Sequence, residues 1–241
     1  MNRNILIVND DGIRSEGICR LAAAAAHFGT VWVAAPEHQC SGMSQKISIF
    51  DRIPVTPYAF PVPVEAAWSI GGTPADCVKA AVNFLLKEKP DLVLSGINDG
   101  YNAGFDTAYS GTIGAAMEAL MKGIPAIAFS KGLHSGFDTV DRYLLPLMDE
   151  LIRAPLPPSE IWNVNFPSVS LPECRGVLYD RTVAPIQLYR DLYHREDQPG
   201  GVFTLQNISM PATAGDAPED SDVRAVLGGY VSVGRLRCAV L

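Results

Sequence analysis

The stretch NILIVNDDGIRSEGICRLAAAAAHFGTVWVAA, residues 4–35, predicts the fold of the chain. Residues 5–8 are a short aliphatic run, typical of a strand that is buried on both faces. Ser15 then lies where a helix would be capped, and the following apolar residues keep the helical period up to Gly29. Residues 30–35 form a second apolar run. Strand, helix and strand in this order predict a parallel β-α-β unit.

The same alternation continues along the chain. The segment Thr73-Pro74-Ala75-Asp76 predicts a helix start, with a capping threonine, a proline in the first turn and an acidic residue close behind. We therefore predict an α/β fold for residues 1–170, a doubly wound, mostly parallel, Rossmann-like sheet with helices on both faces. Further strands are expected at residues 91–95, 126–130 and 161–166, and further helices at residues 73–88, 112–122 and 139–154.

Two segments interrupt this pattern. Residues 42–70 contain two extended stretches around a proline-rich turn, which predicts an inserted hairpin. From residue 171 onward the helical period is lost, and short strand-like pieces alternate with loops rich in Pro, Gly and Asp. We therefore expect residues 171–241 to form a small β-rich appendage.

The composition excludes several classes of function. Of the 241 residues 48% are hydrophobic and 19% are charged, so the chain can bury a full core and is not disordered. The formal net charge is −7 and the basic residues are scattered, so we expect neither nucleic acid nor a membrane as a partner. The N-terminus leads into only a short apolar run. We therefore expect no signal peptide, no transmembrane helix and a cytoplasmic location.

Polar residues follow three of the predicted strands. Ligands of an open α/β sheet bind at the carboxyl ends of its strands, and there Asp10 and Asp11 follow the first strand. Two adjacent carboxylates are costly to bury, and a hard cation would compensate the cost. Asn98 and Ser41 supply amide and hydroxyl oxygens from other strand ends, a donor set that suits Mg²⁺, Mn²⁺ or Ca²⁺ rather than zinc. The alternative is a helix cap made by Asp11, with Asp10 solvated.

A second candidate feature is Ser110-Gly111-Thr112, which opens a helix after a glycine-containing loop. Free backbone N–H groups and the helix dipole make such a start an anion site, although an ordinary serine or threonine cap explains it as well. The loops at this edge are poor in Lys and Arg. A metal ion and a helix end would therefore have to neutralise an anionic substrate.

Other classes lack their motifs here. No GxxxxGK[ST], no GxGxxG after the first strand and no GxSxG is present. Phospho-receiver domains also carry an acidic pair, and Lys131 matches their lysine, but Ser95-Gly96 stands where they need an acceptor aspartate. Aspartyl-phosphate phosphatases have Asp-x-Asp, whereas here the two aspartates are adjacent. A non-catalytic nucleotide-binding or phosphate-binding protein remains a further alternative.

Taken together and in this order, the motifs resemble those of the SurE (survival protein E) family of metal-dependent nucleotidases. The matching stretches are NDDG at 9–12, AP(x)₄SG at 35–42, GTPADCV at 72–78, SGIN(x)G(x)N(x)G at 95–104, YSGT(x)GAA at 109–116, NVNFP at 163–167 and GYVSV at 229–233. The resemblance implies hydrolysis of nucleoside 5′- and 3′-monophosphates to nucleoside and phosphate, with exopolyphosphatase side activity in some members. It also implies dimers or tetramers that form through the C-terminal β region.

The resemblance also implies roles for individual residues. One divalent ion per subunit, Mg²⁺ or Mn²⁺ with Ca²⁺ as an alternative occupant, would be held by Asp10, Asp11, Ser41 and Asn98. The phosphate pocket would be lined by Asn98, Asn102, Ser110, Gly111 and Thr112, with Asn9 in support. Asp10 and Asp11 would also be the catalytic residues, orienting or deprotonating a metal-activated water that attacks phosphorus.

Overall fold

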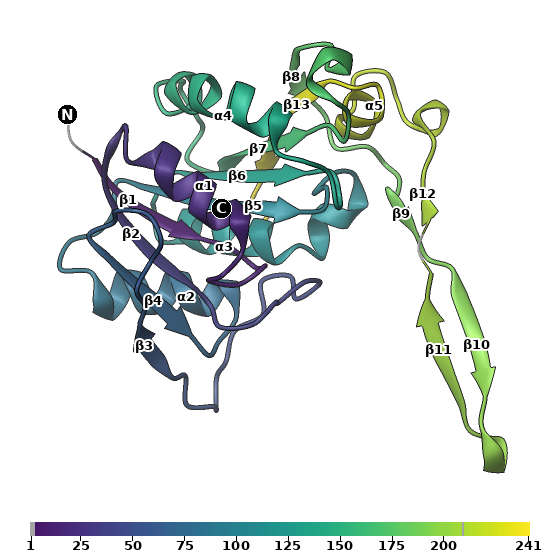
Figure 1. Ribbon diagram of the computed structural model, residues 1–241, viewed down its shortest axis with the longest axis horizontal. Coiled ribbons are helices and arrows are strands. Elements are labelled where there is room, and N and C mark those ends of the chain that lie inside the picture. Colours follow the sequence, from purple (N-terminus) through teal and green to yellow (C-terminus); the bar gives the residue numbers. More distant parts are fainter. Residues whose placement is uncertain (1–2, 209) are drawn as a thin grey trace.

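The computed structural model describes residues 3–208 and 210–241 (Figure 1). Its centre is a nine-stranded sheet in the order β3-β4-β2-β1-β5-β6-β7-β13-β8. The strands of this sheet are β1 (Arg3–Val8), β2 (Gly29–Pro36), β3 (Val55–Pro57), β4 (Ala66–Ile70), β5 (Leu92–Asp99), β6 (Ala126–Lys131), β7 (Glu160–Phe166), β8 (Val177–Arg181) and β13 (Val231–Arg237). The helices are α1 (Glu16–Ala25), α2 (Pro74–Ala80), α3 (Gly111–Met121), α4 (Asp138–Leu151) and α5 (Asp222–Leu227), with short η1 (Ala81–Leu85), η2 (Phe105–Ala108), η3 (Leu171–Glu173), η4 (Pro199–Gly201) and η5 (Ala214–Asp216).

The middle of the sheet is parallel and apolar. β1 pairs in parallel with β2 and β5, so Ile5 lies between Val31 and Leu92. Helices α1 and α4 pack on one face and α2 and α3 on the other, which gives two separate apolar cores. This arrangement confirms the predicted doubly wound α/β fold. Among the described helices, none is both long and apolar enough to cross a membrane.

The predicted start of α2 is confirmed, but its predicted end is wrong. The Thr73 side chain accepts a hydrogen bond from the Asp76 N–H, and the Asp76 side chain accepts one from the Thr73 N–H, which completes a capping box. After Ala80 the chain continues as one turn of π-helix, η1, rather than as α-helix. The wider turn rotates the following side chains, so Phe84, which a continued α-helical period would place on the buried face, is 86% exposed.

The hairpin expected within residues 42–70 is formed by β3 and β4, which pair antiparallel. It does not stand apart from the sheet, because β4 also pairs in parallel with β2 and so extends that edge.

The C-terminal segment is only in part an appendage. β13 lies between β7 and β8 in the main sheet, where it pairs antiparallel with β7. Val231 and Val233 are fully buried there and join the core under α1 and α4. The boundary expected at residue 170 therefore does not separate the sheet from the rest of the chain. β13 pairs with the edge of β7, and its alternating apolar residues are buried in the core.

Of the remaining C-terminal strands, the outer pair stays against the body of the protein, where Tyr189 packs on a small apolar core around Tyr101 and Ala103, and the inner pair leaves it. The outer pair is β9 (Tyr189–Arg190) and β12 (Met210–Pro211), and the inner pair is β10 (Tyr193–Asp197) and β11 (Phe203–Asn207). β10 and β11 pair only with each other and form a hairpin that projects far from the sheet (Figure 1). We refer to residues 193–207 as the arm.

Candidate active site

The end of β1 places Asp10 against the start of α3. Asp10 is 2% exposed, and its Oδ1 accepts a hydrogen bond of 2.5 Å from the Thr112 hydroxyl. A Cβ added to Gly111 would lie 2.9 Å from the Cβ of Asp10, closer than such atoms approach one another. The glycine therefore lets the first turn of α3 lie directly on the carboxylate-bearing residue.

Asp11 points to a different neighbour. Its Oδ2 accepts a hydrogen bond of 2.9 Å from the backbone N–H of Asp99, at the end of β5. Its Oδ1 accepts a longer one, 3.5 Å, from the Gln39 amide in the loop after β2. The two adjacent carboxylates therefore face different walls of one edge of the sheet.

Both carboxylates are held where ionisation is unfavourable. Burial raises the pKa of Asp10 to about 7, and the charge of Asp11 adds to the rise, while the Thr112 hydrogen bond opposes it. Burial also raises the pKa of Asp11, against the effect of the Asp99 N–H. The site therefore favours a compensating positive charge.

The segments that carry Ser41 and Asn98 lie at the same edge. The backbone N–H of Cys40 donates to the Asp10 carbonyl at 2.7 Å, which brings the exposed Ser41 beside β1. Asn98 is the penultimate residue of β5, and its side-chain nitrogen donates to the Gly100 carbonyl at 2.7 Å. Within the described contacts, Ser41 makes no bond to either aspartate.

The residues at this edge fit a hard divalent cation. Their donors are carboxylate, amide and hydroxyl oxygens, which Mg²⁺ and Mn²⁺ prefer. Asn9 donates through its nitrogen to the Gly12 carbonyl and the Ser15 hydroxyl, and its buried Oδ1 has no hydrogen-bond partner among the described atoms. The described part of the chain holds no group of three or more His, Cys, Asp or Glu that could bind a metal. A cation here would therefore need the serine and asparagine oxygens as well.

The predicted phosphate loop is a capped helix start. The Ser110 hydroxyl accepts a hydrogen bond from the Ile113 N–H at 3.1 Å, and the Thr112 carbonyl accepts one from the buried Ser95 hydroxyl at 2.8 Å. These contacts fix the first turn of α3 to β5 and leave the positive end of its dipole beside Asp10. The cap expected for Ser110 and the anion site are therefore compatible.

Asn102, by contrast, is held in a buried polar network. Its side-chain nitrogen donates to the Ser130 hydroxyl at 2.7 Å, and its N–H donates to the Asn165 Oδ1 at 2.8 Å. Its carbonyl accepts from the side chains of both Asn163 and Asn165. The network ties the loop after β5 to β6 and β7. Sequence reasoning missed the two strand asparagines, whose signal is the polar alternation within NVNFP.

Sequence reasoning also assigned no site role to Asp99 and Lys131. The two residues are cross-strand partners at the ends of β5 and β6, and Lys131, only 3% exposed, donates to the Asp99 carboxylate. Burial would raise the pKa of Asp99, but the hydrogen bond and charge of Lys131 prevail and lower it. The pair borders an open cleft of about 610 Å³ that begins at Asp11.

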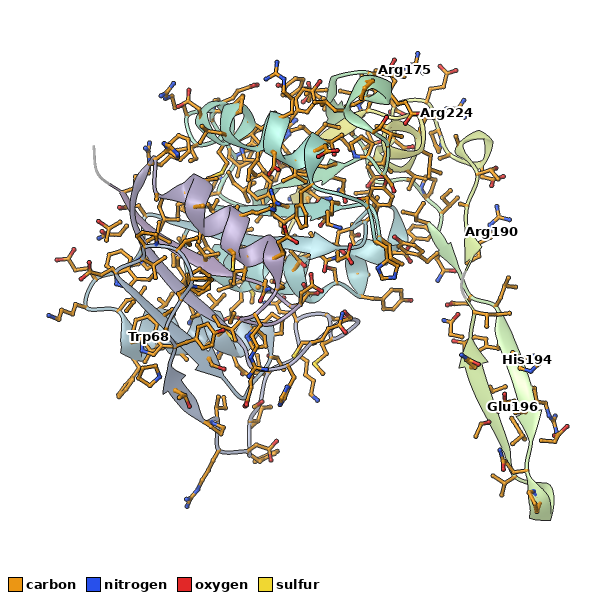
Figure 2. The ribbon with its side chains drawn as sticks, in the orientation of Figure 1. Trp68, Arg175, Arg190, His194, Glu196 and Arg224 are labelled. Atoms are coloured by element: carbon orange, nitrogen blue, oxygen red, sulfur yellow. The ribbon has the colours of Figure 1, made fainter. Side chains whose placement is uncertain are left out.

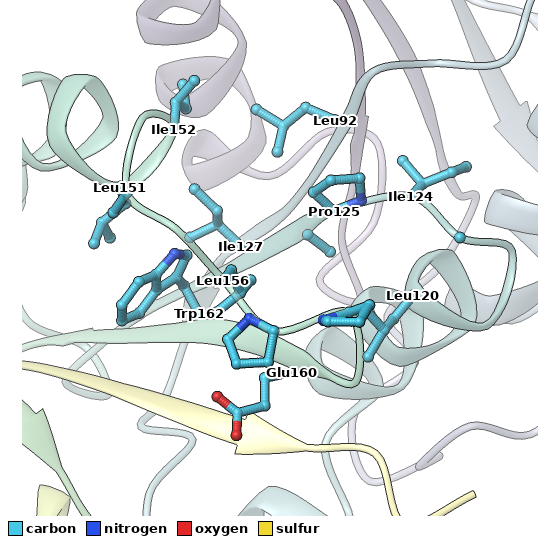
Figure 3. A pocket seen from close by; sticks show the side chains of 15 residues that line it. Leu92, Leu120, Ile124, Pro125, Ile127, Leu151, Ile152, Leu156, Glu160 and Trp162 are labelled. Carbon is cyan, nitrogen blue, oxygen red and sulfur yellow. The ribbon is translucent and has the colours of Figure 1, made fainter. Parts of the chain in front are cut away.

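A different cavity, of about 310 Å³, lies at the other end of the strands, away from the acidic pair (Figure 3). Its wall includes Leu92 and Glu160, the first residues of β5 and β7, so it lies at the amino ends of the strands. Figure 3 shows mainly aliphatic side chains around Trp162. This cavity offers no groups for phosphate chemistry, and the carboxyl edge remains the candidate site.

The fold and the site define a Rossmann-like α/β protein with an acidic pair at the carboxyl edge of the sheet, where one of the two carboxylates contacts a helix start. The model of one family, "Survival protein SurE", matches residues 5–186, and the chain belongs to this family.

Relatives and a solved structure agree with this assignment. The chain is 39% identical to "5'-nucleotidase SurE" of Synechococcus sp. (strain JA-3-3Ab), over 97% of this chain and 91% of that protein. It is also 39% identical to "5'/3'-nucleotidase SurE" of Cronobacter sakazakii, over 95% of this chain and 88% of that protein. The crystal structure of the SurE protein from Aquifex aeolicus superposes with a TM-score of 0.80 at 33% identity, covering 97% of this chain and 92% of that one.

Proposed function

We propose that the chain is a phosphomonoester hydrolase of the nucleotidase class, which converts nucleoside 5′- and 3′-monophosphates to nucleoside and phosphate with one Mg²⁺ or Mn²⁺ ion. The observation that carries the proposal is the contact of the buried Asp10 with Thr112, which joins the acidic pair to a helix start suited to phosphate. The names of the relatives as nucleotidases support the substrate class.

The proposed ion would be held by Asp10, Asp11, Ser41 and Asn98. When bound, it would supply a Lewis acid for the phosphoryl oxygens and lower the pKa of a water molecule. The first-turn amides of α3, at Gly111 and Thr112, would bind the equatorial phosphate oxygens. An aspartate of the pair would orient the attacking water and accept its proton, while the Thr112 and Asp99 hydrogen bonds hold the two carboxylates in place.

The test is phosphate release from a panel of 5′- and 3′-nucleoside monophosphates, without metal and with Mg²⁺ or Mn²⁺. We expect release that depends on metal and is lost in Asp10→Asn, but not in Asp149→Asn, a control on the exposed side of α4. Retention of full metal-dependent rates in Asp10→Asn would refute the assignment of the site. Release from inorganic polyphosphate, tested beside the panel, addresses the predicted exopolyphosphatase activity.

Two alternative chemistries are tested in the same preparation. A receiver-type protein would form an acyl-phosphate with a phosphoryl donor, but Ser95, at the acceptor position, is fully buried and bonded to the Thr112 carbonyl. We therefore expect no acyl-phosphate on the protein. An aspartyl-phosphate intermediate would be trapped by borohydride during turnover, and we expect none if water attacks directly.

We also propose that the chain forms a homo-oligomer, a dimer or tetramer, through the arm. An isolated two-stranded hairpin is marginally stable in water, yet Tyr193, Phe203 and Leu205 are all exposed on it. Figure 2 shows the polar side chains of His194 and Glu196 on the same projecting strand pair. Light scattering should give a mass above that of one chain for the wild type. Phe203→Asp combined with Leu205→Asp should lower that mass, and an unchanged mass would refute the role of the arm.

A further inference from the structure

The cleft that begins at Asp11 is large enough for half of a nucleotide. Its volume of about 610 Å³ lies within the usual range for small-molecule sites. It runs between the start of α1 and the turn after β6, and its walls include Gln39, Ile97 and Phe137. The wall at α1 is closely packed, because a Cβ on Gly17 would lie 2.1 Å from the Ile97 carbonyl oxygen.

The charges of the cleft are unusual for a site beside phosphate chemistry. Three carboxylates line it, those of Asp11, Glu16 and Asp99, against the single ammonium of Lys131. Lys131 donates to the Asp99 carboxylate and to the carbonyls of Gly132 and Ser135, so its three protons are already committed. The cleft therefore offers acceptors and no uncommitted lysine or arginine among its described lining residues.

The arginine next to the cleft is also paired with carboxylates. Arg20 donates to Glu16 at 2.6 Å and to Asp141 at 2.5 Å, and its guanidinium lies 4.4 Å from the centre of the Phe137 ring. The exposed imidazole of His134 lies 3.4 Å from the Asp99 carboxylate. A phosphate in the cleft would face these carboxylates, and no uncommitted lysine or arginine among the described lining residues could pair with it. A hydroxyl or amino group, in contrast, would find hydrogen-bond acceptors.

We propose that this cleft binds the nucleoside half of a nucleoside monophosphate. Asp99 and Glu16 accept hydrogen bonds from the sugar hydroxyls or from an amino group of the base, while Phe137 and Ile97 supply apolar contact. The same carboxylates disfavour nucleoside diphosphates, because the additional phosphate would lie against them. This inference rests on the proposed function and adds substrate selection to it.

The test compares AMP, which has a nucleoside, with p-nitrophenyl phosphate, which has none. Glu16→Gln and Asp99→Asn should each raise the KM for AMP, by about tenfold for Asp99→Asn, the effect of losing one hydrogen bond to a charged acceptor. The kcat/KM for p-nitrophenyl phosphate should change much less. Asp149→Asn is the matched control, because Asp149 also pairs with an arginine at helical spacing but lies outside the cleft.

A second arm uses ADP. Wild-type kcat/KM should be at least about tenfold lower for ADP than for AMP, and Glu16→Gln should narrow that ratio because it removes one of the opposing charges. Equal losses on AMP and p-nitrophenyl phosphate, or no change in either, would overturn the inference while leaving the nucleotidase proposal intact. Failure of the wild type to hydrolyse either substrate with any metal would instead refute the proposed function. Circular dichroism shows whether Asp99→Asn folds, and if it does not, Glu16→Gln carries the test.

Discussion

The cost of burying Asp10 can be measured directly. Without a cation, the fold holds this carboxyl with a pKa of about 7 rather than 3.8, mainly because of burial. A rise of this size corresponds to at most about 4 kcal/mol of unfavourable free energy once the group is ionised. Asp10→Asn removes the charge and keeps an oxygen that can accept the Thr112 hydrogen bond.

We expect Asp10→Asn to stabilise the metal-free protein at pH 8. Part of the gain is lost because the new amide nitrogen has to fit beside Gly111, so we expect about half, about 2 kcal/mol, or a melting temperature roughly 4–8 °C higher. The pH dependence has a defined sign. The folded protein binds the Asp10 proton more tightly than the unfolded chain, so the penalty develops as pH rises from about 4 to above 7, and the stability gained by the variant should fall to less than half at pH 5.

The assay is thermal unfolding with a chelator at pH 5 and pH 8, and again with Mn²⁺. Mn²⁺ should raise the melting temperature of the wild type and have much less effect on Asp10→Asn, because a ligand stabilises only the state that binds it. Asp149→Asn serves as the exposed control. A variant that melts at or below the wild-type temperature at pH 8 in chelator, or a gain that is the same at both pH values, would refute the reasoning.

Three further substitutions test the contacts around the site. Gly111→Ala should lower stability by about 1–3 kcal/mol and weaken Mn²⁺ binding in a calorimetric titration, because its Cβ would lie 2.9 Å from the Cβ of Asp10. Asn165→Ala should lower the free energy of unfolding in urea by about 2–3 kcal/mol, because it leaves the buried N–H of Asn102 without its acceptor. A loss of less than about 0.5 kcal/mol, typical of a surface substitution, would contradict the role of the network. Thr73→Ala should cost about 1 kcal/mol by the same assay, as for other lost helix caps.

Local signals predicted the central fold well. The apolar run of β1, the cap at Thr73 and the glycine at the start of α3 act over a few residues, and the structure has strands or helices there. The pairing of β13 with β7 could not be predicted, because alternating apolar residues indicate a strand but not its partner. The exposure of Phe84 could not be predicted, because nothing in the local sequence marks the change from α-helix to π-turn.

In the candidate site, too, some features could be predicted from the sequence and others could not. Asp10, Asp11 and the start of α3 could be brought together from sequence, because the carboxyl ends of parallel strands lie at one edge, the two aspartates directly follow β1, and the loop after β5 leads into α3. The Asp99–Lys131 pair could not, because it depends on the register of β5 against β6, which shifts between Ser95 and Asn98.

The position of β13 has a consequence for how the chain acquires its structure during synthesis. β8 joins the main sheet only through β13, yet the arm and α5 are made between them. While the ribosome adds those residues, one edge of β7 remains unpaired, and Val231 and Val233 are not yet available to complete the core under α1 and α4. We therefore expect the long-range pairing of β13 with β7 to form late and slowly compared with local pairing, and to leave an unpaired strand edge exposed in the nascent protein until then.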